Sequence, residues 1–384
     1  MIYLDRAATT EVRREVLEAM WPYLTGEFGN PSSSHSLGAT AARALADARS
    51  RVARVLGARP GDIVFTSGGS ESDTLAIVGI ALANPRGRHV VTTAIEHPAV
   101  LESCAHLARI HGFEVTVLPV GPDGLLDLGA LEAAGRPDTT LVSVMYANNE
   151  VGTVQDIAAI ARIAHGSGAL VHSDAVQAPG WLPLDVQELG VDALSLSGHK
   201  VGAPKGIGAL FVRGRIPLEP VIHGGGQERG RRSGTENLAG AVGLATGLEI
   251  VDRHRTEAAP TVTRVRDAFI DDVLASVPDA RLTGSPTHRL PGSASFTFPT
   301  TSGEAVLLEL ERAGILCSSG SACAAGSDEP SHVLVALGIA PEVAQTAVRF
   351  SFDETVSRAE LAEVAIAVRD AVRTVAAGGA PPAR

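Results

Sequence analysis

Cysteine is scarce in this chain, whose 384 residues contain only Cys104, Cys317 and Cys323. Three cysteines cannot form the disulfide framework of a secreted protein. Their spacing also contains no CxxC pair or His-rich tract of the kind that binds a metal. The sequence therefore predicts a protein of the reducing cytoplasm that has neither a disulfide scaffold nor a metal site.

Long apolar runs are missing as well. No stretch reaches the roughly 18 uninterrupted apolar residues of a membrane-spanning helix, and Met1 to Asp5 do not begin a secretory signal. The formal net charge is -11, which repels phosphate backbones, and the one dense basic cluster, Arg229 to Arg232, lies among glycines. We therefore expect neither a membrane nor a nucleic acid as a direct partner.

The composition, 45% apolar and 20% charged, is that of a globular protein with a large core. From about Val90 onward, short apolar runs alternate with helical patterns, which indicates a parallel sheet covered by helices. The clearest unit is a strand at 141–145, an amphipathic helix at 157–164 and a strand at 169–172. Further strands are predicted at 191–196 and 208–212.

The pattern changes after Arg213 to glycine-rich loops and then to a long helical stretch at 240–276. Beyond it, a strand at 293–296, a helix at 303–312 and a strand at 348–352 indicate a smaller α+β unit. We predict an α/β protein of two domains. Residues 14–250 form the large domain, with a mainly parallel sheet flanked by helices, and residues 1–13 with 251–384 form the small one.

A lysine and an aspartate are predicted at the same edge of the large sheet. Lys200 follows one strand in Ser197-Gly198-His199-Lys200, and Asp174 ends another. A lone lysine is usually a solvated surface charge. Open α/β sheets, however, bind ligands at the carboxyl ends of their strands, and a lysine beside a buried carboxylate suits pyridoxal phosphate, which needs a covalent amine and a partner for its pyridinium nitrogen.

The cofactor's phosphate requires a second element. Thr66 to Ser72 follows a short apolar run and precedes a helical pattern at 75–83. Glycines at such a strand-to-helix turn let backbone N–H groups approach an anion. The alternative is an ordinary tight turn with a helix cap, so the interpretation depends on the neighbouring features.

The three cysteines lie in different settings. Cys323 follows Ser318-Ser319-Gly320-Ser321-Ala322 and precedes a polar stretch with glycine and proline, which predicts an exposed loop carrying the catalytic thiol. Cys104 lies in an amphipathic helical pattern and Cys317 beside a strand pattern, so both are predicted to be structural.

Motifs in family order run through most of the chain, and the sequence resembles the NifS/IscS-type cysteine desulfurases. These enzymes belong to the class V aminotransferase group of fold-type I pyridoxal-phosphate enzymes. The resemblance implies the PLP-dependent transferase fold, pyridoxal 5'-phosphate as cofactor and L-cysteine as substrate. The motifs are Leu4-Asp5 with Ala7 to Thr10, Phe28 to Pro31, Phe65 to Gly68, Glu96-His97, Asn148 to Gly152, Asp174 to Gln177, Ser197 to Lys200, Arg232 to Thr235 and Ser318 to Cys323.

The resemblance also implies a role for each matching residue. Lys200 would bond to the cofactor, and His97 would stack on its ring and transfer protons. The other cofactor-binding positions would be Gly69, Ser70, Asp174, Gln177, Ser197, His199 and, from a neighbouring subunit of a homodimer, Thr235. Asn149 and Arg349 would bind the substrate carboxylate, since an arginine fork suits a carboxylate.

The implied reaction uses the Cys323 thiolate to attack the sulfur of cofactor-bound cysteine, which leaves alanine and a persulfide on Cys323. An acceptor protein would take the sulfur for iron–sulfur assembly, tRNA thiolation, DNA phosphorothioation or a biosynthetic pathway. A selenocysteine lyase or another class V aminotransferase reaction is the alternative. Cys323 in its serine-rich loop argues against an aminotransferase, because transamination requires no thiol. A binding protein that has lost catalysis is also disfavoured, because each matching catalytic position holds the required type of residue.

Some positions depart from the family pattern. Arg6 stands where histidine, tyrosine or a small residue is usual, Ser70 where threonine is common, Thr74 where asparagine is frequent, and Asp353 where glycine is. These departures are expected to change the local geometry of the site and its mouth, and not the reaction.

Overall fold

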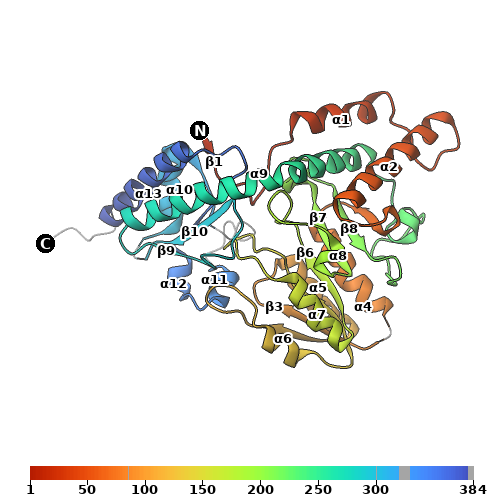
Figure 1. The fold of residues 1–384 in the computed structure, drawn as a ribbon, viewed down its shortest axis with the longest axis horizontal. Helices are drawn as coiled ribbons and strands as arrows, with labels where there is room; N and C mark the ends of the chain where they lie inside the picture. The colour runs from red at the N-terminus through yellow and green to blue at the C-terminus, as the bar shows by residue number, and fades with distance from the viewer. Residues whose placement is uncertain (85, 300, 320–328, 379–384) are drawn as a thin grey trace.

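The structure, a computed structural model, describes residues 1–84, 86–299, 301–319 and 329–378. Its larger sheet has seven strands (Figure 1). Only β8 runs antiparallel to its neighbours β7 and β2, so the predicted α/β class with a mainly parallel sheet is confirmed. In spatial order the strands are β2 (Ile63–Thr66), β8 (Gly208–Val212), β7 (Ala193–Ser197), β6 (Leu170–Asp174), β5 (Thr139–Ser143), β3 (His89–Thr93) and β4 (Glu114–Leu118).

Helices cover both faces of this sheet because successive strand residues are apolar on both sides. Val91 and Val142 belong to a core that includes residues of α1, α2, α7 and α9. Val90 and Leu141, their chain neighbours, belong to a second core with residues of α5 and the helix over 69–83. The helices are α1 (Arg14–Thr25), α2 (Ser36–Val55), α3 (Gly69–Thr74), a π-helical turn (Leu75–Gly79), α4 (Ile80–Ala83), α5 (Pro98–His111), α6 (Leu128–Ala134), α7 (Ile157–Ser167), α8 (Val186–Leu189) and α9 (Leu238–Ser276).

Local chemistry sets the ends of α7, the helix of the predicted strand–helix–strand unit. The Asp156 side chain accepts a hydrogen bond from the N–H of Ala159 at 3.0 Å, which caps the first turn. Gly168, with φ of 80°, ends the helix in the left-handed conformation that glycine adopts without strain. The polypeptide then enters β6, whose last residue is Asp174.

A separate core, that of the small sheet, forms around a three-stranded antiparallel sheet of order β12-β10-β9. Phe269 packs edge-on against Phe350 and Phe296, with ring centroids 5.3 and 5.9 Å apart. Leu4 belongs to this core. The elements are β9 (Arg281–Leu282), β10 (Ser293–Thr297), α10 (Gly303–Arg312), β11 (Ile315–Leu316), α11 (His332–Ala336), α12 (Pro341–Ala344), β12 (Ala347–Ser351), α13 (Arg358–Gly378) and, from the N-terminus, β1 (Ile2–Tyr3), which pairs parallel with β11.

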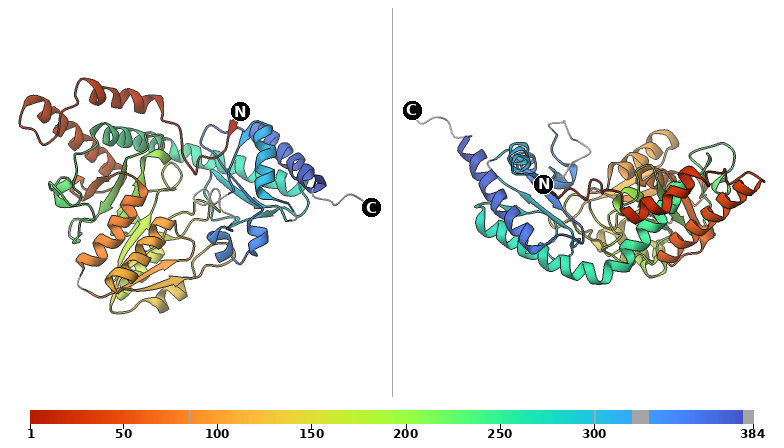
Figure 2. Two further views of the ribbon diagram at one scale, coloured as in Figure 1. Left: turned by 180° about the vertical axis from the view of Figure 1, so that it is seen from behind. Right: turned by 90° about the horizontal axis from the view of Figure 1, so that it is seen from above.

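Helix α9 links the core of the large sheet to the core of the small sheet. It has 39 residues and runs from the large sheet to the small one (Figure 1 and Figure 2). Its first half packs in the core of the large sheet and its second half, beyond Pro260, in the core of the small sheet. The domain boundary predicted at 250/251 therefore falls inside a continuous helix and stays a prediction. Within the described residues, no helix combines the length and the apolar character needed to cross a bilayer.

Several predicted boundaries differ from the structure by a few residues, and two of the differences have a clear physical reason. The strand predicted at 141–145 is β5, which ends at Ser143. Beyond it, the N–H of Met145 donates to the carboxylate of Glu96 and not to a neighbouring strand. The helical pattern predicted from residue 75 begins earlier, at Gly69, because the polar residues 69–74 form the first turns of the same helix.

Candidate active site

A cavity of about 240 Å³, here called the inner cavity, opens where β6 and β7 end. Because parallel strands direct their carboxyl ends to one edge, residues far apart in the sequence meet there. Most of the predicted site residues line it. They are Gly69, Ser70, His97, Asn149, Asp174, Gln177, Ser197, His199, Lys200 and Arg349.

Lys200 reaches into the inner cavity from a short helical turn, Gly198–Lys200, that directly follows β7. Its Nζ donates hydrogen bonds to the carbonyl oxygens of Ala7 and, at 2.8 Å, Ala8. The Gln177 amide also donates to Ala7 O, at 3.0 Å. The N-terminal segment thus supplies the acceptors that hold the amine at the cavity wall.

Asp174 is the last residue of β6, and its carboxylate accepts a hydrogen bond from the N–H of Val176 at 2.8 Å. Burial raises its pKa, against the opposing effects of that hydrogen bond and of the neighbouring His97 and Lys200 side chains. Such a carboxylate gains stability from a cationic partner inside the cavity.

A second buried acid, Asp73, lines the same cavity and was not predicted. It is 1% exposed, and burial, followed by the charge of Asp174, raises its pKa well above the usual range. Two neighbouring buried carboxyls cannot both ionise without a cation between or beside them. The signal in the sequence was its spacing, since a residue three positions after Ser70 lies on the same helix face.

His97 both caps a helix and lines the inner cavity. Its Nδ1 accepts a hydrogen bond from the N–H of Ala99 at 3.1 Å, which caps α5, and its side chain also lines the cavity. Burial lowers the pKa of His97 against the raising effect of the Asp174 charge, and the charges of Lys200 and His332 lower it further. The imidazole is therefore neutral near pH 7, with its proton on Nε2.

The turn before His97 is held by Glu96, another residue that was not predicted individually. Its carboxyl accepts hydrogen bonds from the Thr93 hydroxyl at 2.6 Å and from the N–H of Met145 at 3.0 Å. Burial raises the pKa of Glu96 to about 8. This anchoring fixes the entry of α5 and with it the position of the imidazole.

The opposite wall suits an anion. Gly69 and Ser70 begin the helix over 69–83, where backbone N–H groups lack helical partners. A Cβ at Gly69 would lie only 2.9 Å from Cγ2 of Val176, so a larger residue at this position would crowd the Val176 side chain in the cavity wall. His199, whose Nδ1 lies 3.1 Å from the Thr9 hydroxyl, has its pKa lowered to about 4, first by burial and then by Lys200 and Lys205.

Arg349 lies in the middle of β12 and is 1% exposed. Its guanidinium donates to the Asn149 carbonyl oxygen at 2.9 Å and to the Asp5 carboxylate at 2.6 Å. The predicted neighbourhood of Arg349 and Asn149 is thus present. Asp5, which the sequence offered only as part of a motif, is the counter-ion of this buried arginine.

One predicted site residue lies away from this lining, and another falls outside the described residues. Thr235 is exposed and is absent from the described lining of its own chain's cavity. Cys323 lies outside the described residues. Cys104 is buried in α5 and Cys317 directly follows β11; burial raises the pKa of both thiols to about 12. Within the described ranges, no three His, Cys, Asp or Glu side chains are grouped as metal ligands.

Both the sequence and the structure of this chain are similar to those of known proteins. The family model described as aminotransferase class-V matches residues 2–364. The chain is 48% identical over 351 residues to a cysteine desulfurase IscS of Methanosarcina thermophila, covering 91% of this chain and 86% of that protein. Among solved structures, a NifS-like protein superposes with a TM-score of 0.90 at 37% identity, covering 97% and 99% of the two chains. SspA in complex with cysteine gives 0.81 at 38%, covering 92% and 99%.

Proposed function

Because this chain belongs to the class-V aminotransferase family and is a cysteine desulfurase, we propose that it binds pyridoxal phosphate in the inner cavity and transfers the sulfur of L-cysteine to Cys323. The observation that carries the proposal is the pairing of Lys200 with Asp174 in one cavity, each at the end of a neighbouring strand. A covalent amine and a buried acid are the two groups that this cofactor requires of a protein.

The remaining walls fit the same cofactor. Asp174 would face the pyridinium nitrogen, whose positive charge relieves the cost of burying the carboxylate, and Gln177 would face the phenolic oxygen. The phosphate would lie at the start of the helix over 69–83, with Ser70, Ser197 and His199 around it. When bound, pyridoxal phosphate supplies an electron sink that lets the Cα proton of an amino acid leave.

The protein's own groups would orient the substrate and move its protons. Arg349 would receive the carboxylate of L-cysteine through its planar fork of donors, beside Asn149. Lys200 Nζ lies in the same cavity as the imidazole of His97, so both can exchange protons with a bound amino acid. The neutral state of His97 permits this near pH 7. The solved structure of SspA in complex with cysteine supports the choice of substrate.

Sulfur transfer would use Cys323. The raised pKa values of Cys104 and Cys317 leave both as neutral thiols, and thiolate is the nucleophilic form. In the reaction, the Cys323 thiolate would attack the substrate sulfur and the C–S bond would break. The electron pair of that bond stays with the substrate carbon, which takes up a proton to become the methyl group of alanine, and the sulfur remains on Cys323 as a persulfide. The persulfide then passes to a sulfur-acceptor protein in the cytoplasm.

The protein would act as a homodimer. A stripe of exposed apolar side chains recurs at helical spacing along and just beyond α1. Its members are Leu17 (52% exposed), Trp21 (66%), Leu24 (59%) and Phe28 (66%). Burial of such an apolar stripe favours association. Thr235, exposed on its own chain, would then reach the phosphate in the partner's cavity.

Mass spectrometry after incubation with L-cysteine and without reductant tests the central proposal. We expect a gain of about 32 Da, one sulfur atom, on the Cys323 peptide. Cys323→Ser should bind cofactor and substrate but form neither persulfide nor alanine. Cys104→Ser and Cys317→Ser serve as controls and should retain the mass gain. A persulfide on Cys317, or undiminished desulfuration by Cys323→Ser, would show that the assignment is wrong.

A further inference from the structure

A second, outer cavity of about 350 Å³ adjoins the inner one. Both cavities are lined by Ala7, Gln177 and Lys200. The segment over residues 5–13, here called the strap, therefore forms part of the wall between them. Any displacement of the strap changes the surroundings of Lys200.

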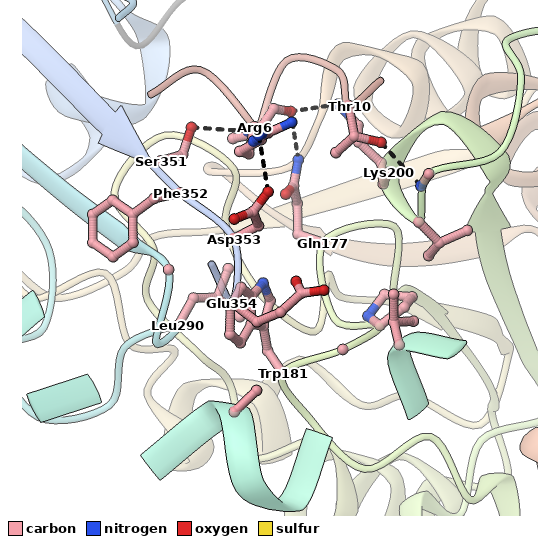
Figure 3. A pocket seen from close by; sticks show the side chains of 18 of the residues that line it. Arg6, Thr10, Gln177, Trp181, Lys200, Leu290, Ser351, Phe352, Asp353 and Glu354 are labelled. Atoms are coloured by element: carbon pink, nitrogen blue, oxygen red, sulfur yellow. Dashed lines mark hydrogen bonds and ion pairs between the residues drawn. The ribbon is translucent and has the colours of Figure 1, made fainter. Parts of the chain in front are cut away.

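Charged side chains fasten the strap to the segment that follows β12. Arg6 forms an ion pair with Asp353 at 2.9 Å, and Arg13 pairs with Glu354 at 2.7 Å. A further ion pair, of Arg6 with Glu11, lies within the strap itself. Figure 3 shows Arg6 and Asp353 reaching toward one another in the outer cavity. Their side chains are only 17 and 22% exposed, so solvent screens this pair less than it screens an ordinary surface ion pair.

The two partners of this ion pair were noted independently in the sequence. Arg6 and Asp353 are both positions at which the chain departs from the pattern of the family it resembles. They are 347 residues apart in the chain, and the fold brings them into contact. The fold thus joins, in one ion pair, two positions that the resemblance marked separately as departures.

The backbone of the strap carries this attachment to the reacting groups. The N–H of Arg6 donates to Ser351 O at 3.1 Å, and at the other end the N–H of Thr10 donates to His199 O at 2.9 Å. Between these points, Ala7 O and Ala8 O accept from Lys200 Nζ. The carboxylate of Asp5, the first residue of the strap, holds Arg349.

We propose that Arg6 and Asp353 are positioning residues of the desulfurase reaction. Their ion pair latches the strap, so that the carbonyls of Ala7 and Ala8 keep the Lys200 amine in place and Asp5 keeps Arg349 oriented. Neither Arg6 nor Asp353 lines the inner cavity, so both act through the strap. This inference rests on the roles proposed above for Lys200 and Arg349.

The test combines amide hydrogen exchange with steady-state kinetics on the holoenzyme. In Arg6→Gln, which loses two ion pairs, we expect exchange in peptides covering residues 4–13 to quicken by about tenfold. The KM for L-cysteine should rise about three- to tenfold as Arg349 loses its orientation. Asp353→Asn should act in the same direction, and Arg6→Lys should restore most of the KM.

Further variants separate the latch from general stability. The double variant Arg6→Gln/Asp353→Asn should be no worse than Arg6→Gln alone, because the two residues act as one pair. Arg312→Gln, which breaks an exposed ion pair with Glu309 in α10, is the matched control and should change neither exchange in the strap nor KM.

Faster exchange with an unchanged KM would reduce the pair to a structural contact and overturn the inference. If exchange and KM are unchanged in Arg6→Gln while the borohydride-reducible link between Lys200 and the cofactor is intact, this inference is wrong and the proposed function stands. A wild-type holoenzyme without that link at Lys200 would instead overturn the proposed function, and this inference with it.

Discussion

Asp5 and Arg349 lie 344 positions apart in the chain, yet the carboxylate of the first accepts a hydrogen bond from the guanidinium of the second at 2.6 Å. Arg349 is buried in the small sheet, and Asp5 stands at the start of the strap that also contacts Lys200. The group proposed to bind substrate and the group proposed to bind cofactor are therefore both held by one short segment near the N-terminus.

Asp5→Asn should weaken substrate binding. The amide keeps the size of the side chain but removes the charge that orients Arg349, so we expect the KM for L-cysteine to rise about tenfold, or ~1.4 kcal/mol. The free energy of unfolding should fall by about 1–3 kcal/mol, as for a lost hydrogen bond to a charged group. Kinetics and urea unfolding measure both, with Asp370→Asn, an exposed partner of Arg369, as the control. An unchanged KM would contradict the prediction.

Lys200→Ala should abolish turnover and the near-visible absorbance of the covalently held cofactor. The sequence contains only one other lysine, Lys205, which is exposed and does not line the inner cavity. Lys205→Ala should therefore retain both properties. Borohydride reduction followed by peptide mapping checks the assignment, and a reducible link that survives in Lys200→Ala would refute it.

The pH dependence of kcat/KM should report His97. Because burial lowers its pKa, His97 should stay neutral to a lower pH than an ordinary exposed imidazole does. Protonation, and with it loss of activity, is expected only below that pH. The acid limb of the profile should disappear from the residual activity of His97→Gln. A wild-type limb centred above pH 7 would contradict a neutral, buried imidazole.

Trp21→Glu should separate the proposed homodimer, because a charge at the centre of the exposed stripe on α1 would be buried without a partner. Sedimentation velocity at micromolar concentration should show the wild type as a dimer and the variant as a monomer with weakened cofactor binding. Ile366→Glu, at another exposed apolar side chain, on α13 (53% exposed), is the control and should stay dimeric. A fully active monomer would argue against the shared site.

Sequence reasoning was most successful where a local pattern carries the information. The alternating apolar runs predicted the sheet, and the polar residues after each run predicted the edge at which the cavity lies. Strand ends were predicted less well. The N–H of Met145, for example, donates to the side chain of Glu96 and not to a neighbouring strand, and this contact spans 49 residues of sequence. Asp73 was missed because its only signal in the sequence, its spacing three positions after Ser70, does not distinguish a buried side chain from a solvated one.

The sequence by itself determined the family, the class of fold and the chemical types of the groups in the cavity, because these follow from residue identity and from the period of apolar residues along the chain. Only the tertiary structure decided which groups act on one another. The pairing of Asp5 with Arg349, of Arg6 with Asp353, and of Asp73 with Asp174 depends on how the N-terminal strap, β12 and the large sheet pack. Charge interactions depend on distance and burial in space, and separation along the chain specifies neither.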